Sequence, residues 1–180
     1  MRMESPFKLD VVSVRLVKEA PLFSGRKIEK PEDAVAVVGG MLREMDREVI
    51  CVVNLKTDGT PINCSIASVG ALNMAIAEPR ELFKSAILSN AAKLLLAHNH
   101  PSGSLSPSKE GVRITDRMAR LGSLIGIPLS DHVIVGGEDG MYYSFRENGM
   151  IRLPQVIYAD DPAELRLEPG PFAAEKGRGR

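Results

Sequence analysis

Tryptophan is absent from this 180-residue sequence, whose aromatic residues are five phenylalanines and three tyrosines. So few aromatic side chains argue against a stacking platform for single-stranded nucleic acid. Lysine plus arginine number 23, as do aspartate plus glutamate, so the formal net charge is zero. A neutral chain does not hold nucleic acid or an anionic membrane by bulk electrostatic attraction. The composition therefore gives no strong nucleic-acid signal and favours no membrane partner.

Long hydrophobic runs and cysteines are also scarce. No apolar run approaches the roughly 20 residues that a membrane-spanning helix needs. The N-terminal residues MRMESPFKLD lack the apolar core of a signal peptide, so we expect a cytoplasmic protein. Cys51 and Cys64 form neither a disulfide framework nor a CxxC metal motif. We expect both to be reduced and buried, near each other across a hairpin.

The hydrophobic pattern predicts one domain in which strands and helices alternate. Turn signals at residues 57–60 and 136–140 each join two strands as a hairpin, which makes those pairs antiparallel. The fold class predicted is therefore α/β, a mixed β-sheet flanked by helices. Strands are expected over residues 9–19, 48–55, 61–69, 93–97, 131–136 and 141–145, and helices from about residues 31, 79 and 108.

The chain divides into three parts. Residues 1–30 are predicted to form an N-terminal strand and a loop that pack on the domain, and residues 31–151 form the domain itself. Residues 152–180 lose hydrophobic periodicity, contain several prolines and glycines, and end in GRGR. We expect this last part to be a flexible tail or a segment that docks on a protein partner.

The residues that carry chemistry are concentrated in the segment AHNHPSGSLSPSKEG, residues 97–111. His98 and His100 directly follow a short apolar strand, where the chain relaxes into a loop and both imidazoles can point to one place. Neutral imidazole is the commonest protein ligand of zinc. The alternative is a pair of surface or hydrogen-bonded loop histidines. The Pro-Ser-Gly segment and the helix N-terminus that follow favour a metal site.

Other classes of zinc hydrolase that use histidine motifs do not fit. A barrel amidohydrolase also has an HxH motif after a strand, but a (β/α)₈ barrel takes about 250 residues. The helical HExxH motif of the zincins is absent from the sequence, and so is the HxE…PCxxC signature of the zinc deaminases.

The longer segment LLLAHNHPSGSLSPSKEGVRITDRM resembles the metal-site segment of the RadC family, bacterial members of the JAB/MPN (JAMM) metalloprotease-like superfamily. Further segments follow in family order, including DRE at residues 46–48, SVGALN at 68–73, PRE at 79–81 and LSDH at 129–132. The resemblance covers residues 31–150, about two thirds of the chain. It implies the MPN/JAB fold, a mixed sheet between helices with a layering similar to that of cytidine deaminases.

The superfamily motif is a glutamate, the HxH pair, a serine and an aspartate. The resemblance implies that His98 and His100 bind Zn²⁺, that Ser108 helps to hold the developing oxyanion, and that Glu48 is the general acid and base. The implied reaction is hydrolysis of a peptide or an isopeptide-linked protein. In that reaction a water activated by the zinc would attack the amide carbonyl, and Glu48 would take its proton and return it to the leaving amine.

The motif aspartate, the third zinc ligand of the superfamily, is replaced here by Gly111. Asp116 lies about 140° further around the helix and about 7.5 Å along it, so it points elsewhere. Glu110 is about 100° off, and Ser102, Ser106 or an extra water are weaker substitutes. Because catalytic zinc normally has three protein ligands and a water, we expect this chain to bind zinc weakly.

Two functions are therefore kept open: a JAMM-like metallopeptidase, or a catalytically impaired MPN scaffold that binds protein partners, which Gly111 favours. Asp131 and His132 could support the metal ligands from behind, with a buried structural pair as the simpler interpretation. The family is often labelled as DNA repair proteins, a label that this neutral composition does not support. Either function is compatible with an oligomer.

Overall fold

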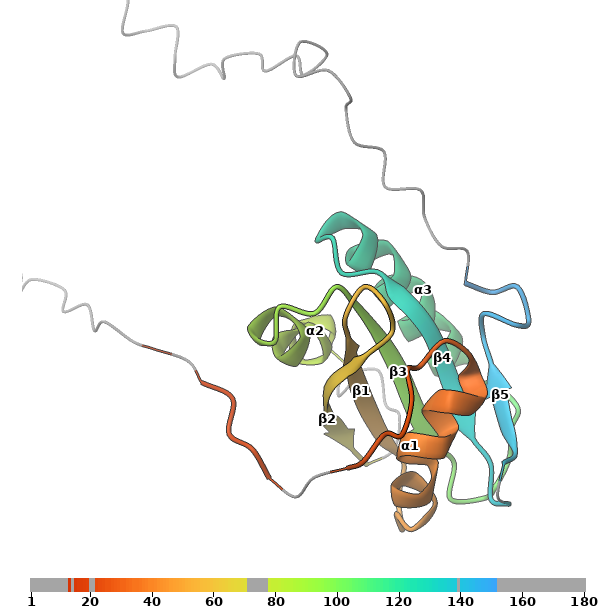
Figure 1. Ribbon diagram of the computed structural model, residues 1–180. Coiled ribbons are helices and arrows are strands. Elements are labelled where there is room, and N and C mark those ends of the chain that lie inside the picture. The colour runs from red at the N-terminus through yellow and green to blue at the C-terminus, as the bar shows by residue number, and fades with distance from the viewer. Residues whose placement is uncertain (1–12, 14, 20–21, 71–77, 139, 152–180) are drawn as a thin grey trace, which may run out of the picture.

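The computed structural model describes residues 13, 15–19, 22–70, 78–138 and 140–151 (Figure 1). Its five strands form one sheet in the order β2-β1-β3-β4-β5. β3 and β4 pair in parallel, and the other neighbouring strands pair antiparallel. The predicted α/β fold with a mixed sheet is confirmed. The elements are α1 (Pro31–Arg43), β1 (Val49–Leu55), β2 (Pro61–Val69), α2 (Pro79–Leu88), β3 (Lys93–Asn99), α3 (Lys109–Leu124), β4 (Leu129–Val135) and β5 (Tyr142–Ser144).

Each face of the sheet has its own hydrophobic core, because successive strand residues point to opposite faces. α1 covers one face, where Val53 and Val133 belong to the core. α2 and α3 cover the other face, where the core includes Ile50 and Ile134. Figure 1 shows these helices on the two sides of the sheet. Among the described helices, none has the length and apolar character needed to cross a membrane.

The loop before α1 packs on the turn between β1 and β2. Ile28 is buried, and its N–H donates to the carbonyl oxygen of Gly59 at 2.9 Å. The carboxylate of Asp33 in the first turn of α1 accepts from the backbone N–H groups of Glu29 and Lys30, which holds the loop against the helix start. Pro31 occupies the first helical position, where a missing N–H costs nothing.

The strand expected over residues 9–19 is wrong for the part of it that the structure describes. Ser13 and residues 15–19 are exposed and belong to no strand. Leu16 and Val17 are 47% and 86% exposed. Apolar and polar residues partly alternate in this segment, but its apolar side chains are not buried against another part of the described structure. The predicted tail, residues 152–180, lies outside the described residues.

The two cysteines are free and lie close together across the hairpin, as predicted, but only one of them is fully buried. Cys51 is buried in β1, and Cys64 is partly buried in β2, where it pairs with Val53. A hydrogen bond with Cys64, together with burial, raises the pKa of the Cys51 thiol. This environment favours the protonated, unreactive form of Cys51.

α3 connects the parallel strands β3 and β4, so its N-terminus lies beside the end of β3. Ser108 is its N-cap, and the Ser108 hydroxyl oxygen accepts from the Gly111 N–H at 2.9 Å. Near the other end, Gly122 lets the helix approach the following turn. A Cβ on Gly122 would lie 2.6 Å from the carbonyl oxygen of Ile127.

We predict that Gly122→Ala and Gly40→Ala change stability in opposite directions. The new methyl group at position 122 collides with backbone, which should cost about 1–3 kcal/mol. Gly40 lies in α1 with nothing within 4 Å of its Cβ position, so alanine there should gain up to about 1 kcal/mol. Urea unfolding of both variants measures this. Equal effects at the two positions would contradict the close approach at Gly122.

Candidate metal centre

The two motif histidines lie at the carboxyl end of β3. His98 is within the strand and fully buried, and His100 follows the strand and is partly exposed. In the antiparallel ladder His98 is opposite Ile50, whose side chain belongs to the core covered by α2 and α3. Directly opposed residues share a face of the sheet. His98 therefore points into the layer between the sheet and α3.

The separation of the two imidazoles fits a pair of ligands on one metal ion. The Nε2 atoms of His98 and His100 are 3.2 Å apart. Two nitrogens bound to one tetrahedral zinc at about 2.0–2.1 Å would lie roughly 3.3–3.4 Å from each other. The other nitrogen of His100, Nδ1, donates to the carbonyl oxygen of Ser104 at 2.7 Å. That bond leaves a lone pair on Nε2 of His100, where a metal needs it.

His132 supports His98 from behind. Nδ1 of His98 is 2.8 Å from Nε2 of His132, and Nδ1 of His132 is 2.6 Å from the hydroxyl oxygen of Thr115 in α3. The ring of Phe145 stacks on His132 with centroids 4.7 Å apart. Burial lowers the pKa of both rings, that of His132 to about 3. Both imidazoles are therefore neutral at pH 7, the form that binds a metal ion.

Asp131, the neighbour of His132, faces the other side of the sheet. Its carboxylate accepts hydrogen bonds from the Ser144 hydroxyl at 2.6 Å and from the backbone N–H groups of His132 and Arg146. Burial raises the pKa of Asp131. Because strand residues alternate between faces, only one of two neighbours can meet His98. Of the two residues considered as support for the metal ligands, His132 contacts the site, whereas Asp131 ties β4 to the turn after β5.

Glu48 lies immediately before β1, the strand that pairs with the histidine-bearing strand β3. Ile50 pairs with His98, so the same register continued by two residues brings Glu48 opposite His100. The Glu48 residue is partly buried, and its carbonyl oxygen accepts from the Gly70 N–H at 2.8 Å. The fold thus brings the predicted acid and base to the same end of the sheet as the predicted ligands.

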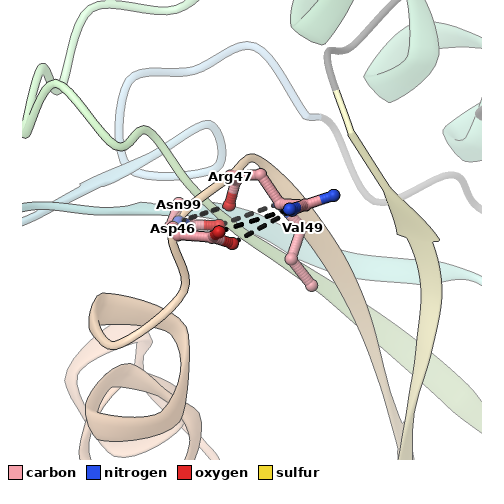
Figure 2. Close-up of polar contacts among 4 residues, drawn as sticks. All are labelled: Asp46, Arg47, Val49 and Asn99. Carbon is pink, nitrogen blue, oxygen red and sulfur yellow. Dashed lines mark hydrogen bonds and ion pairs between the residues drawn. The ribbon is translucent and has the colours of Figure 1, made fainter.

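Asn99, between the two histidines, fixes the chain around Glu48 (Figure 2). Its side-chain oxygen accepts from the Val49 N–H at 2.9 Å, and its side-chain nitrogen donates to the carbonyl oxygen of Arg47 at 3.0 Å. Asn99 is buried, and its bond to the Val49 N–H is shielded from water, whereas its bond to the carbonyl oxygen of Arg47 is only partly buried. Figure 2 also shows the exposed ion pair between Asp46 and Arg47 in the same turn.

Ser108 and Gly111 face each other in the first turn of α3. Ser108 uses an oxygen lone pair for its cap, which leaves its hydroxyl hydrogen to donate elsewhere. Gly111 is buried, and a Cβ there would lie 3.2 Å from the Ser108 hydroxyl oxygen and 3.9 Å from Cζ of Phe145. The motif position therefore faces the histidine layer. Asp116 instead pairs with Arg120 on the exposed side of α3.

The ligand set has two members. Among the residues that the structure describes, no three histidines, cysteines, aspartates or glutamates are arranged to hold one metal ion. His98 and His100 are suited to bind together, and the third position, which Gly111 occupies in sequence, supplies no donor atom. The residues present fit a metal held by two imidazoles, and they do not form a closed three-ligand site.

Asn99 and Thr115 are the two site residues that the sequence analysis missed. Asn99 lies between the two histidines of the HxH motif, and no local sequence pattern shows that it is buried and bonds to backbone groups. Thr115 is four residues after Gly111 in a helix, a spacing at which its hydroxyl bonds to the carbonyl oxygen of residue 111, here at 2.6 Å. The Thr115 hydroxyl oxygen also contacts His132, which is 17 residues later in the sequence, and this contact depends on the tertiary fold.

Comparison with known proteins connects this site to a family. Residues 28–150 match the family described as RadC-like JAB domain. UPF0758 proteins from three organisms are similar: Rubrobacter xylanophilus, 44% identical over 124 residues (69% of this chain, 53% of the relative); Clostridium acetobutylicum, 42% over 129 (72% and 56%); and Methanosarcina acetivorans, 39% over 127 (71% and 55%). The chain spans about half the length of these curated relatives.

We predict that the metal-free protein loses stability as the pH falls below about 6.5, the usual pKa of histidine. The pKa values of His98 and His132 are lower in the folded protein than in the unfolded chain, so unfolding takes up protons in this range. Each ring should lower the free energy of unfolding by about 1.4 kcal/mol per pH unit. Urea unfolding between pH 7 and 5 measures the slope. In His132→Gln the slope of the unfolding free energy against pH should fall by the contribution of one ring. An unchanged slope in that variant would show that His132 is not the group that takes up a proton on unfolding.

We also predict that Asn99→Ala destabilises the fold by about 1–3 kcal/mol, because the N–H of buried Val49 loses its partner. Asp46→Ala is the matched control, since it removes a polar contact of the same turn that is exposed to water. Thermal unfolding should show a loss for Asn99→Ala and no measurable change for Asp46→Ala. Similar behaviour of the two variants would show that Asn99 does not hold this segment.

Proposed function

Because the chain belongs to the RadC-like JAB domain family, we propose that it is a zinc-dependent hydrolase of the peptidase or isopeptidase type with a weak metal site. The observation that carries the proposal is the histidine pair, whose Nε2 atoms are 3.2 Å apart while each Nδ1 has a separate partner. Two rings held in this way present converging nitrogens to one ion.

His98 and His100 would hold the zinc. Zinc bound there would supply Lewis acidity, lowering the pKa of water and polarising the carbonyl group of a substrate. Glu48, opposite His100 in the continued register, would take a proton from the attacking water and return it to the leaving amine. The Ser108 hydroxyl would donate its free hydrogen to the carbonyl oxygen of the substrate as negative charge develops there.

The missing third ligand determines how tightly the site binds. The side-chain position of residue 111 faces Ser108 and Phe145, on the same side of α3 as Thr115 and the histidine layer. A carboxylate at this position would complete the ligand set of the superfamily motif. With glycine there, water must fill two positions, so we propose a low affinity for zinc and a correspondingly low turnover.

The test is zinc binding by the purified chain, measured by competition with a chromophoric chelator. We predict one weakly bound zinc per chain and loss of binding in His98→Gln and in His100→Gln. Gly111→Asp should raise the affinity at least about tenfold, since a full ligand set resembles a catalytic site. Gly111→Ala is the matched control, because it adds the Cβ without a ligand.

Two results would contradict the proposal. Zinc binding that survives both histidine substitutions would place the metal elsewhere. An equal gain of affinity in Gly111→Ala and Gly111→Asp would show that helix stability, and not a third ligand, limits binding.

A second function is favoured by the two-member ligand set itself: a catalytically impaired MPN scaffold that binds protein partners. Under this alternative the domain keeps the fold and loses the reaction. Hydrolysis of an isopeptide-linked model substrate at saturating zinc distinguishes the two. Turnover by the natural chain that depends on Glu48 supports the hydrolase. Turnover by Gly111→Asp alone supports the scaffold.

A further inference from the structure

A continuous chain of hydrogen bonds runs through the proposed metal site and ends inside α3. One end is the carbonyl oxygen of Ser104, which accepts from His100, and the other is the carbonyl oxygen of Gly111. The links between them are short. Successive donor–acceptor distances are 2.7 Å (Ser104–His100), 3.2 Å (His100–His98), 2.8 Å (His98–His132), 2.6 Å (His132–Thr115) and 2.6 Å (Thr115–Gly111).

The hydroxyl group of Thr115 can complete this chain in two ways. It has one hydrogen and two acceptors at the same distance of 2.6 Å, the carbonyl oxygen of Gly111 and Nδ1 of His132. His98 and His132 are fully buried and neutral, so each ring carries one hydrogen on one of its two nitrogens. The choice made by Thr115 therefore sets the direction of every bond between it and His98.

In the first direction Thr115 donates to Nδ1 of His132. His132 then donates from Nε2 to Nδ1 of His98, and His98 donates from Nε2 to Nε2 of His100. Each of the four links from Thr115 to Ser104 then has one hydrogen, whereas the 2.6 Å contact between the Thr115 hydroxyl and the carbonyl oxygen of Gly111 has none. No metal is needed between the two Nε2 atoms in this direction. Nε2 of His98 is protonated, however, and cannot bind one.

In the second direction Thr115 donates to Gly111. His132 donates from Nδ1 to Thr115, and His98 donates from Nδ1 to Nε2 of His132. The Nε2 lone pairs of His98 and His100 now face each other across 3.2 Å. Two lone pairs at this distance repel unless a cation lies between them. This direction is therefore the one that a metal selects.

We propose that Thr115 and His132 form a reversible hydrogen-bond relay that determines which nitrogen of His98 carries the hydrogen, and that both are positioning residues for a metal held by His98 and His100. The inference rests on the proposed metal site and extends it to α3. Hydrogens balance on reversal. In net terms one hydrogen moves from Nε2 of His98 to Nδ1 of His132. His98 releases its Nε2 hydrogen to solvent and receives at Nδ1 the Nε2 hydrogen of His132. Because His132 is fully buried, it takes up a hydrogen from solvent at Nδ1 only when the layer between the sheet and α3 opens. Thr115 keeps its hydrogen and turns it from His132 to Gly111.

Removing the hydroxyl affects the two directions unequally. In Thr115→Val the first direction leaves a buried lone pair on Nδ1 of His132 without a donor. The second direction leaves a buried N–H without an acceptor, and orphaned N–H groups are the rarer defect in folded proteins. Valine therefore favours the first direction, with the hydrogen of His98 on Nε2. Thr115→Ser keeps a hydroxyl and should keep both directions.

The experiment is ¹⁵N NMR of the histidine rings in the full chain, with and without zinc, beside a measurement of zinc affinity. Two-bond nitrogen–hydrogen correlations show which ring nitrogen carries the hydrogen. In the natural protein we expect His98 and His132 to carry it on Nε2 without zinc and on Nδ1 with zinc. Thr115→Val should weaken zinc binding by about 10–100-fold, as loss of a partner behind a metal ligand does. Thr115→Ser should bind as the natural protein does.

Each outcome distinguishes the relay from the metal site. If His98 and His132 keep one tautomer with and without bound zinc, the relay is wrong and the metal site stands. The same holds if Thr115→Val, folded by its backbone NMR spectrum, binds zinc as tightly as the natural protein. The tautomer comparison in the natural protein needs no variant, so poor folding of Thr115→Val does not remove the test. If the natural protein binds no zinc, both proposals fail together.

Discussion

The contact between His98 and His132 constrains the rest of the site. Two imidazole rings lie 2.8 Å apart in a layer closed to water, where neither can carry a charge at neutral pH. Each must then offer one N–H and one lone pair, and each must find partners for both. Thr115 on one side and His100 on the other provide them, so α3 and the loop after β3 are arranged around this pair of rings.

The topology of the sheet explains why these groups meet. β3 and β4 are parallel neighbours joined by α3, so the start of the helix returns to the end of β3, where His98 and His100 lie. The same alternation that points His132 toward α3 points Asp131 toward α1. Two adjacent buried polar residues therefore serve different purposes. His132 contacts the candidate metal ligand His98, and Asp131 anchors the turn after β5 through Ser144 and Arg146.

Much of this fold follows from local patterns. The strands from β1 onward, the three helices and the two hairpins were predicted from hydrophobic periodicity and turn residues. The strand expected over residues 9–19 was wrong for the residues described, because periodicity does not show whether a partner surface exists. For the site, the HxH motif and the segment that follows it predicted His98 and His100 as the candidate metal ligands. Asn99 and Thr115 escaped because their roles depend on residues 52 and 17 positions away, Arg47 and His132. No local pattern encodes such contacts.

The central claim is that this chain binds a metal through two imidazoles and no third side chain. X-ray absorption at the zinc edge of the zinc-loaded protein tests it most directly. We predict a first shell of nitrogen and oxygen at about 2.0–2.1 Å, with the outer-shell scattering of two imidazole rings. A shell at about 2.3 Å would indicate cysteine sulfur. That result, or a spectrum without imidazole scattering, would contradict the account.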